Sequence, residues 1–160
     1  MGTNYKDSKN TNSEKEGDMY QDFISDALTK ELGWTISIYK SKKYQFEKGE
    51  SRQGVEIKLD NWCSRSKRLS VETEEKTELE KSFVKSGIYR KDNSIIYIQG
   101  NYEIIFIFAK GLLQMLHNTK KYEEKEDGTF KSFYLPFKDA YRYAIAVIDL
   151  SNKKEEHRQI

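Results

Sequence analysis

The fold of this chain is decided by residues 49–60, which read GESRQGVEIKLD. Gly49 and Gly54 bracket a turn, and the residues after Gly54 alternate between apolar and charged side chains. Successive side chains of a strand point to opposite faces, so the alternation predicts a strand with one apolar and one charged face. The apolar face carries Val55, Ile57 and Leu59, and the charged face carries Glu56, Lys58 and Asp60.

Further strands are predicted on both sides of this segment. Residues 94–98 and 103–108 are the most apolar stretches, joined by a turn, so we expect them at the centre of the sheet. Other strands are predicted at residues 35–39, 44–46, 69–74 and 130–135. The charged residues 120–127 predict an exposed loop.

Apolar residues at helical spacing predict three helices around these strands. The first begins at Asp18 as the N-cap and ends at Gly33, and the second covers residues 110–117. The third begins at Pro136 and places Tyr141, Ala144, Ile145 and Ile148 on one face. This order of elements predicts an α/β fold with a central mixed β-sheet flanked by helices.

The composition fits one folded domain. The chain has 160 residues, 36% of them hydrophobic, and its eleven Tyr and eight Phe are enough to form a core. The ends are polar and carry little that could be buried. We therefore expect a disordered tail at residues 1–17, a single domain at residues 18–150 and a flexible tail at residues 151–160.

Charge, cysteine content and the lack of long apolar runs argue against several classes of protein. The formal net charge of +2 gives no bulk argument for nucleic acid, so a nuclease would need its positive charge concentrated locally. The single cysteine, Cys63, rules out an internal disulfide and a cysteine-based zinc cluster. No apolar run is long enough for a membrane span and no signal peptide opens the chain, so we expect a cytoplasmic protein.

Glu50, Glu56 and Lys58 form the constellation that could carry chemistry. Glu56 and Lys58 share a face of the predicted strand, and the preceding turn could fold Glu50 back toward Glu56. Two carboxylates offer the hard oxygen ligands that suit Mg²⁺, and a lysine beside them can orient water and stabilise charge on a phosphate. The same spacing also suits a solvated edge strand with a surface salt bridge, and it recurs at Glu74 and Lys76.

The order of elements and several short motifs resemble the PD-(D/E)xK nuclease superfamily, in particular its small phage- and prophage-encoded members. The motifs are GESRQGVEIKLD at 49–60, LSVETE at 69–74, SGI at 86–88 and the apolar hairpin at 94–108. The resemblance covers residues 18–116. It implies a restriction-endonuclease-like core and hydrolysis of DNA phosphodiester bonds with Mg²⁺ or Mn²⁺, in the cytoplasm of a bacterial host.

The resemblance also implies a role for each residue of the constellation. Glu50 takes the place of the first metal-binding acid, Glu56 becomes the second metal ligand, and Lys58 the catalytic lysine. The first acid is usually Asp in this superfamily, and Glu47 competes with Glu50 for its place. Many members add a Glu from the first helix, where this chain offers Gln21, Asp22 and Asp26 instead.

Residues around the constellation have both a functional and a structural interpretation. Gln53, Asp60 and Glu72 could support the site, or be an ordinary turn residue, a strand-end acid and a structural side chain. Two basic clusters could contact a phosphate backbone, although solvated loops are the commoner meaning of such clusters. They are Lys40, Lys42 and Lys43, and Arg65, Lys67 and Arg68. His117 is expected to cap a helix end, and residues 86–90 could pack beside the site.

Three functions follow from these interpretations. The first is a small metal-dependent deoxyribonuclease, which has little room for a DNA-reading domain and could depend on a protein partner or a homodimer. The second is a catalytically inactive protein of the same fold that acts as a binding or inhibitory module, for example against a host defence. The third is an unrelated α/β protein in which Glu50, Glu56 and Lys58 form a surface ion pair.

Overall fold

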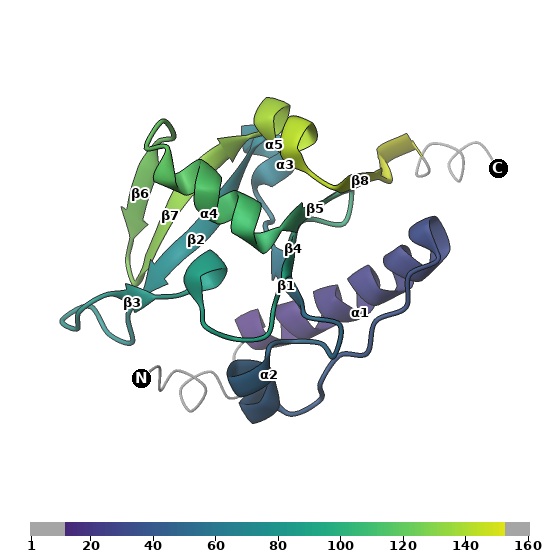
Figure 1. Cartoon of the computed structure of the whole chain (residues 1–160), viewed down its shortest axis with the longest axis horizontal. Helices are drawn as coiled ribbons and strands as arrows, with labels where there is room; N and C mark the ends of the chain where they lie inside the picture. The colour runs from purple at the N-terminus through teal and green to yellow at the C-terminus, as the bar shows by residue number, and fades with distance from the viewer. Residues whose placement is uncertain (1–11, 153–160) are drawn as a thin grey trace.

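The computed structural model describes residues 12–152 and shows a mixed α/β fold with two four-stranded sheets flanked by helices (Figure 1). The first sheet has the strand order β1-β4-β5-β8, with β1 parallel to β4 and the other neighbours antiparallel. The second sheet is antiparallel, with the order β3-β2-β7-β6. The single central sheet expected from the sequence is therefore divided into two.

The bounds of the elements are as follows. The first sheet consists of β1 (Val55–Leu59), β4 (Ile96–Gly100), β5 (Ile104–Ala109) and β8 (Ala146–Asp149). The second consists of β2 (Arg68–Glu75), β3 (Val84–Lys85), β6 (Glu124–Asp127) and β7 (Phe130–Pro136). The helices are α1 (Asn12–Leu32), α2 (Lys42–Lys48), α3 (Cys63–Ser66), the 3₁₀ turn η2 (Gly87–Tyr89), α4 (Lys110–Asn118) and α5 (Phe137–Tyr143).

The first sheet separates two apolar clusters. Helix α1 covers one face, where Leu28 belongs to the same buried cluster as Val55 of β1. On the other face, Phe106 lies in a second buried cluster that also contains Phe133 of β7 and Leu113 of α4. Because side chains alternate along β1, Glu56 and Lys58 point away from α1 and toward the second sheet. This layering takes the charged face of β1 into the interior.

Most of the predicted elements are present. The apolar hairpin forms β4 and β5, which are the two inner strands of the first sheet, as expected. Strands β2 and β7 and helix α4 also lie where the pattern predicted them. Helix α1 ends at Leu32, followed by Gly33 with a φ of +65°, but it begins at Asn12 instead of at Asp18. Residues 1–11 and 153–160, which include most of the predicted tails, lie outside the described part of the chain.

The structure corrects three local predictions. The predicted strand at 44–46 belongs to helix α2, because the Ser41 hydroxyl accepts a hydrogen bond from the Tyr44 N–H and caps that helix. The predicted strand at 35–39 is reduced to a single bridge between Ile38 and Ser51. The charged residues 124–127 form strand β6, not part of a loop.

The final predicted helix is also shorter than the pattern suggested. It ends at Tyr143, and Ala144 has the extended angles φ −65° and ψ 144°. The β-branched residues Val147 and Ile148 then lie in β8, which pairs with β5. Such residues suit a pleated sheet better than a helix, and the edge of β5 supplies the hydrogen bonds. Within residues 12–152, no helix has the length and apolarity required to cross a membrane.

Candidate functional site

The turn at Gly54 brings Glu50 back onto β1. Gly54 has a φ of +68°, and a Cβ atom there would lie 2.7 Å from the carbonyl oxygen of Asn93, so the position requires glycine. After this reversal, the Glu50 Oε2 atom accepts a hydrogen bond of 2.6 Å from the backbone N–H of Ile57. Glu50 therefore lies against the strand that carries Glu56 and Lys58.

Glu56 is the most deeply buried acid of the group, with 2% of its surface exposed. Its Oε1 atom lies 3.6 Å from the ammonium nitrogen of Lys58, and its Oε2 atom lies 3.6 Å from that of Lys110. Lys110 also lies 3.2 Å from Asp92 Oδ1. The burial of Glu56 does not fit the solvated charged face that the sequence left open, although β1 is an edge strand.

Burial makes the ionisation of both acids costly. It raises the pKa of Glu50 to about 8, with a further rise from the charge of Glu56 and a smaller, opposing effect of Lys58. Burial also raises the pKa of Glu56, against the lowering effect of Lys58 and Lys110. The pKa of Lys58 is raised by Glu72 first and also by Glu56 and Glu50, although burial lowers it. Lys58 is thus a cation at neutral pH, and a further cation at the two acids would relieve their repulsion.

A cavity of about 390 Å³ opens beside this group, and we call it the Lys58 cavity. It lies between the two sheets, and its lining includes Lys58, Glu72, Tyr97 and Gln99. Tyr97 and Gln99 belong to β4 and lie directly across from Glu56 and Lys58 in the strand register. Of the three residues expected to act chemically, Lys58 therefore lines a space large enough for a ligand.

Unpaired polar atoms gather at the Lys58 cavity. Within the described part of the chain, Glu72 Oε2, the Tyr97 hydroxyl and Gln99 Oε1 are buried and have no hydrogen-bond partner. Tyr97 is fully buried and Gln99 is 2% exposed. Buried polar groups in native proteins nearly always have a partner, so ordered water or a bound ligand would complete the hydrogen bonds of these three residues.

Glu50 and Glu56 are the side chains that could hold a metal ion. No three His, Cys, Asp or Glu side chains between residues 12 and 152 form a group that could hold one. Mg²⁺, however, is often bound by one or two carboxylates, with water and substrate phosphate completing its shell. Glu56 Oε2 has no hydrogen bond among the described residues, although the ammonium of Lys110 lies 3.6 Å from it. The donor set therefore fits the two-carboxylate mode.

The first helix does not supply a further acid to this group. Gln21, Asp22 and Asp26 lie on α1, which covers the opposite face of the first sheet from Glu56. Asp26 forms an ion pair of 2.9 Å with Lys30 on the same helix. The side chain of the competing acid, Glu47, lies outside what the structure describes.

The three predicted supporting residues have different places. Gln53 is exposed, and its side-chain oxygen accepts a hydrogen bond from the backbone N–H of Ser37. Asp60 accepts hydrogen bonds from the Ser70 N–H and the Gln99 amide, both at 2.9 Å, so it orders the wall of the cavity. Glu72 lines the cavity and has the largest effect on the pKa of Lys58. Glu72 is thus the supporting residue nearest to the chemistry.

The first basic cluster lies away from the Lys58 cavity. Lys40 lines a different cavity beside α1, together with Asp18 and Asp22. Lys43 is exposed on α2, and the side chain of Lys42 lies outside the described residues. This cluster therefore has no place in the wall around Lys58.

The second basic cluster lies closer, because Trp62 lines the Lys58 cavity. The guanidinium of Arg65 lies 5.4 Å from the centre of the Trp62 ring. Arg68 instead lies over the ring of Tyr134, and Lys67 is exposed after α3. Arg65 is therefore the member of the two clusters most directly connected to the cavity.

Three residues at the site, Tyr97, Asp92 and Lys110, were not expected there from the sequence. Arg90 belongs to residues 86–90, which were expected to pack beside the site. Tyr97 could have been inferred from the pairing of β4 with β1, but the sequence does not give that register. Arg90 and Asp92 follow the Ser-Gly-Ile segment. Gly87 of this segment packs against the backbone of Glu72, which brings Arg90 and Asp92 close to Glu56.

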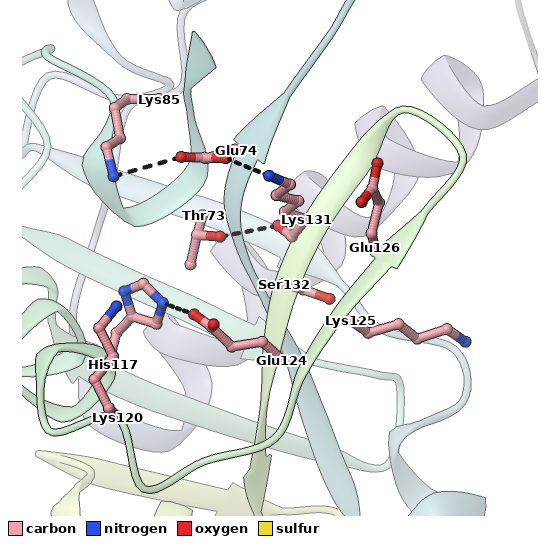
Figure 2. A pocket seen from close by; sticks show the side chains of 10 residues that line it. All are labelled: Thr73, Glu74, Lys85, His117, Lys120, Glu124, Lys125, Glu126, Lys131 and Ser132. Carbon is pink, nitrogen blue, oxygen red and sulfur yellow. Dashed lines mark hydrogen bonds and ion pairs between the residues drawn. The ribbon is translucent and has the colours of Figure 1, made fainter. Parts of the chain in front are cut away.

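A second pocket, of about 330 Å³, lies between α4 and the second sheet (Figure 2). Figure 2 shows His117 directed at Glu124, and Glu74 between Lys85 and Lys131. The Glu74 carboxylate lies 3.6 Å from the ammonium nitrogen of Lys85 and 3.4 Å from that of Lys131. The other ring nitrogen of His117 lies 2.6 Å from the Tyr89 hydroxyl, so this side chain does not serve as the expected helix cap. Because these groups pair with one another, the Lys58 cavity is the better candidate for a functional site.

Comparisons with known proteins give no relative for this chain. A scan against protein-family models, a search of curated proteins and a search of solved structures each found no match.

Proposed function

We propose that this protein is a small metal-dependent nuclease that hydrolyses phosphodiester bonds in DNA. The observation that carries the proposal is the meeting of Glu50, Glu56 and Lys58 at β1, with Glu56 2% exposed and 3.6 Å from Lys58, which lines a cavity. Buried acids with raised pKa values next to a lysine in a cavity are typical of catalytic sites. The motifs that resemble the PD-(D/E)xK superfamily are the same residues, which supports DNA as the substrate.

In this proposal, Glu50 and Glu56 bind one divalent cation, Mg²⁺ or Mn²⁺. When bound, such a cation activates water and offsets charge on a phosphate. Lys58 stays protonated because Glu72, Glu56 and Glu50 favour its charged form, so it acts as a donor to the phosphate oxygens and not as a base. Lys110 contacts Glu56 and holds its carboxylate in position, and Asp92 pairs with the same lysine.

A second candidate is a binding module of the same fold without activity. The observation that favours it is the pairing of both Glu56 oxygens with lysines of the chain itself, Lys58 and Lys110. These cations neutralise the acid without any metal, and a bound cation would have to compete with them. In this case the protein acts through a partner in the cell, and the Lys58 cavity is a recognition site only.

Cleavage assays decide between the two candidates. Single-stranded, linear duplex and circular DNA would be incubated with the protein and Mg²⁺ or Mn²⁺, with EDTA as the metal-free control. We expect metal-dependent cleavage that falls about 10²–10³-fold in Lys58→Met, the usual cost of removing one donor to transition-state charge. Lys30→Met, in an exposed pair on α1, is the matched control and should cleave normally.

A measurement of folding distinguishes the loss of a catalytic side chain from the loss of the native structure. Circular dichroism and thermal melting would show whether Lys58→Met keeps the native fold. Cleavage that persists in a folded Lys58→Met protein would refute the proposed site. If the folded wild-type protein neither cleaves DNA nor binds Mg²⁺ or Mn²⁺ by calorimetry, the binding module is the better account.

A further inference from the structure

The Lys58 cavity has two exposed aromatic side chains at its edge. Trp62 is 66% exposed and Phe130 is 47% exposed, and both line the cavity. They come from distant parts of the chain, Trp62 from the N-terminal end of α3 and Phe130 from the first residue of β7. Exposed aromatic rings beside a cavity offer flat surfaces on which a planar ligand can stack.

The wall below these rings offers hydrogen-bond acceptors. Gln99 Oε1 and Glu72 Oε2 are buried and, in the described region, have no partner, and the Tyr97 hydroxyl is in the same state. The Gln99 amide nitrogen already donates to Asp60 and to the Ser70 carbonyl, which fixes the orientation of its oxygen. Two acceptors and a hydroxyl require a ligand with N–H donors on its edge.

The charge of the lining argues against a phosphate in the part of the cavity that lies away from Lys58. Three acids, Asp60, Glu72 and Asp127, line it with one cation, Lys58. A phosphate placed there would be repelled, whereas a neutral ring with amino groups would not. Positive charge is found outside, where Arg65 lies on Trp62. The arrangement thus suits a base inside and its phosphate near Arg65.

We propose that the Lys58 cavity holds one unpaired nucleobase with an exocyclic amino group, stacked between Trp62 and Phe130. This inference rests on the proposed function, because it names single-stranded DNA as the preferred substrate of the same site. Adenine and cytosine each carry an amino group with two N–H donors, one for Gln99 Oε1 and one for Glu72 Oε2, whereas an unpaired thymine offers only the single donor N3–H. A base in a duplex is paired and stacked, so it cannot enter.

The test is a binding measurement in EDTA, which needs no cleavage. Fluorescein-labelled oligodeoxyadenylate, oligodeoxycytidylate and oligodeoxythymidylate of equal length would be titrated with the protein and followed by anisotropy, beside a blunt duplex. We expect adenine and cytosine strands to bind more tightly than the thymine strand, and the duplex most weakly.

Variants identify the stacking surface. Trp62→Ala and Phe130→Ala should each weaken binding of the adenine strand roughly 5- to 150-fold, the equivalent of about 1–3 kcal/mol per stacked base. Tyr44→Ala is the matched control, because Tyr44 is 54% exposed and lies on α2, outside the cavity lining. Both test residues are exposed, so thermal melting should confirm that the variants fold.

Several results would overturn the inference. One is equal binding of all three strands; another is unchanged binding in Trp62→Ala and Phe130→Ala. Binding of an arginine-rich peptide in place of DNA, dependent on Trp62, would show that the acidic, aromatic cavity recognises a cationic protein partner. Failure of cleavage with intact, Trp62-dependent strand binding would refute the nuclease and leave the base site standing. Duplex cleavage that is unaffected in Trp62→Ala would support the nuclease and refute the base site.

Discussion

The ammonium nitrogen of Lys110 lies 3.6 Å from Glu56 Oε2, and the side chains are only 6% and 2% exposed. Lys110 is the first residue of α4, whereas Glu56 is in the middle of β1, so the pair joins elements that are distant in the sequence. Asp92 lies on the other side of the same ammonium group, at 3.2 Å. One buried cation thus neutralises two buried acids.

Lys110→Met should therefore be strongly destabilising. Removing one partner of a buried ion pair leaves an uncompensated charge and costs about 3–5 kcal/mol. Urea unfolding followed by circular dichroism would measure the loss. Lys30→Met breaks an exposed pair with Asp26 and should change stability by less than about 1 kcal/mol. Equal losses in the two variants would contradict the importance of the buried pair.

The metal-free protein should become less stable as the pH rises. Glu50 has a pKa of about 8 in the folded protein, against 4.5 for the free side chain. Between these values the folded protein keeps a proton that the unfolded chain releases, so the free energy of unfolding falls with increasing pH. One proton gives at most about 1.4 kcal/mol per pH unit, and the partial exposure of Glu50 reduces this.

Glu50→Gln tests this dependence. The amide cannot ionise, so the variant should gain stability over the wild type above about pH 5, with a flatter slope up to about pH 8. Some slope should remain, because burial also raises the pKa of Glu56. Urea unfolding across this range in EDTA is the measurement, and the exposed Glu78→Gln should keep the wild-type slope. A Glu50→Gln profile parallel to that of the wild type would contradict the assignment.

Gly87→Ala should disturb the packing of η2 against β2 at Glu72, which lines the Lys58 cavity. A Cβ atom at Gly87 would lie 2.1 Å from the carbonyl oxygen of Glu72, and the φ of +54° disfavours any other residue. We expect a loss of more than about 1 kcal/mol in thermal or urea unfolding. Gly111→Ala is the opposite case, since nothing lies within 4 Å in helix α4, and it should stabilise by about 0.5–1 kcal/mol. A neutral Gly87→Ala would show that β2 and η2 can move apart.

Mg²⁺ should stabilise the folded protein if Glu50 and Glu56 bind it. At a concentration about 100 times its Kd, the expected gain in the free energy of unfolding is about 2.7 kcal/mol. Glu56→Gln should abolish this gain, and EDTA should reverse it in the wild type. Asp26→Asn, on the far side of the first sheet, should keep the gain. Stabilisation of all three proteins by the same amount would indicate a metal effect elsewhere in the chain.

Local patterns predicted the strands of this protein better than its short helices. The alternation at 55–59 and the apolar runs of β4 and β5 are periodic over their whole length, so the sequence was informative there. Helix α2 depends on a single cap at Ser41, which a short apolar run does not reveal. Strand β8 continues the spacing of a helix but is decided by pairing with β5, a tertiary contact.

The candidate site was predicted in part for the same reason. Spacing alone placed Glu56 and Lys58 on one face, and the two glycines indicated the turn that returns Glu50. Their burial depends on the second sheet, and the counter-charges at Arg90 and Lys110 come from segments that only the tertiary fold brings near. No sequence pattern could give that neighbourhood without the strand register.

Strand β1 lies at the edge of the first sheet, and edge strands with free N–H groups can recruit strands of other molecules. Here the N–H of Val55 donates to the Ser51 hydroxyl at 3.0 Å, and the N–H of Ile57 donates to Glu50. The turn that returns Glu50 to β1 therefore also occupies part of the free edge of this strand and hinders intermolecular strand addition. Substitution of either side chain should leave a backbone N–H of this edge without its acceptor, and so favour aggregation.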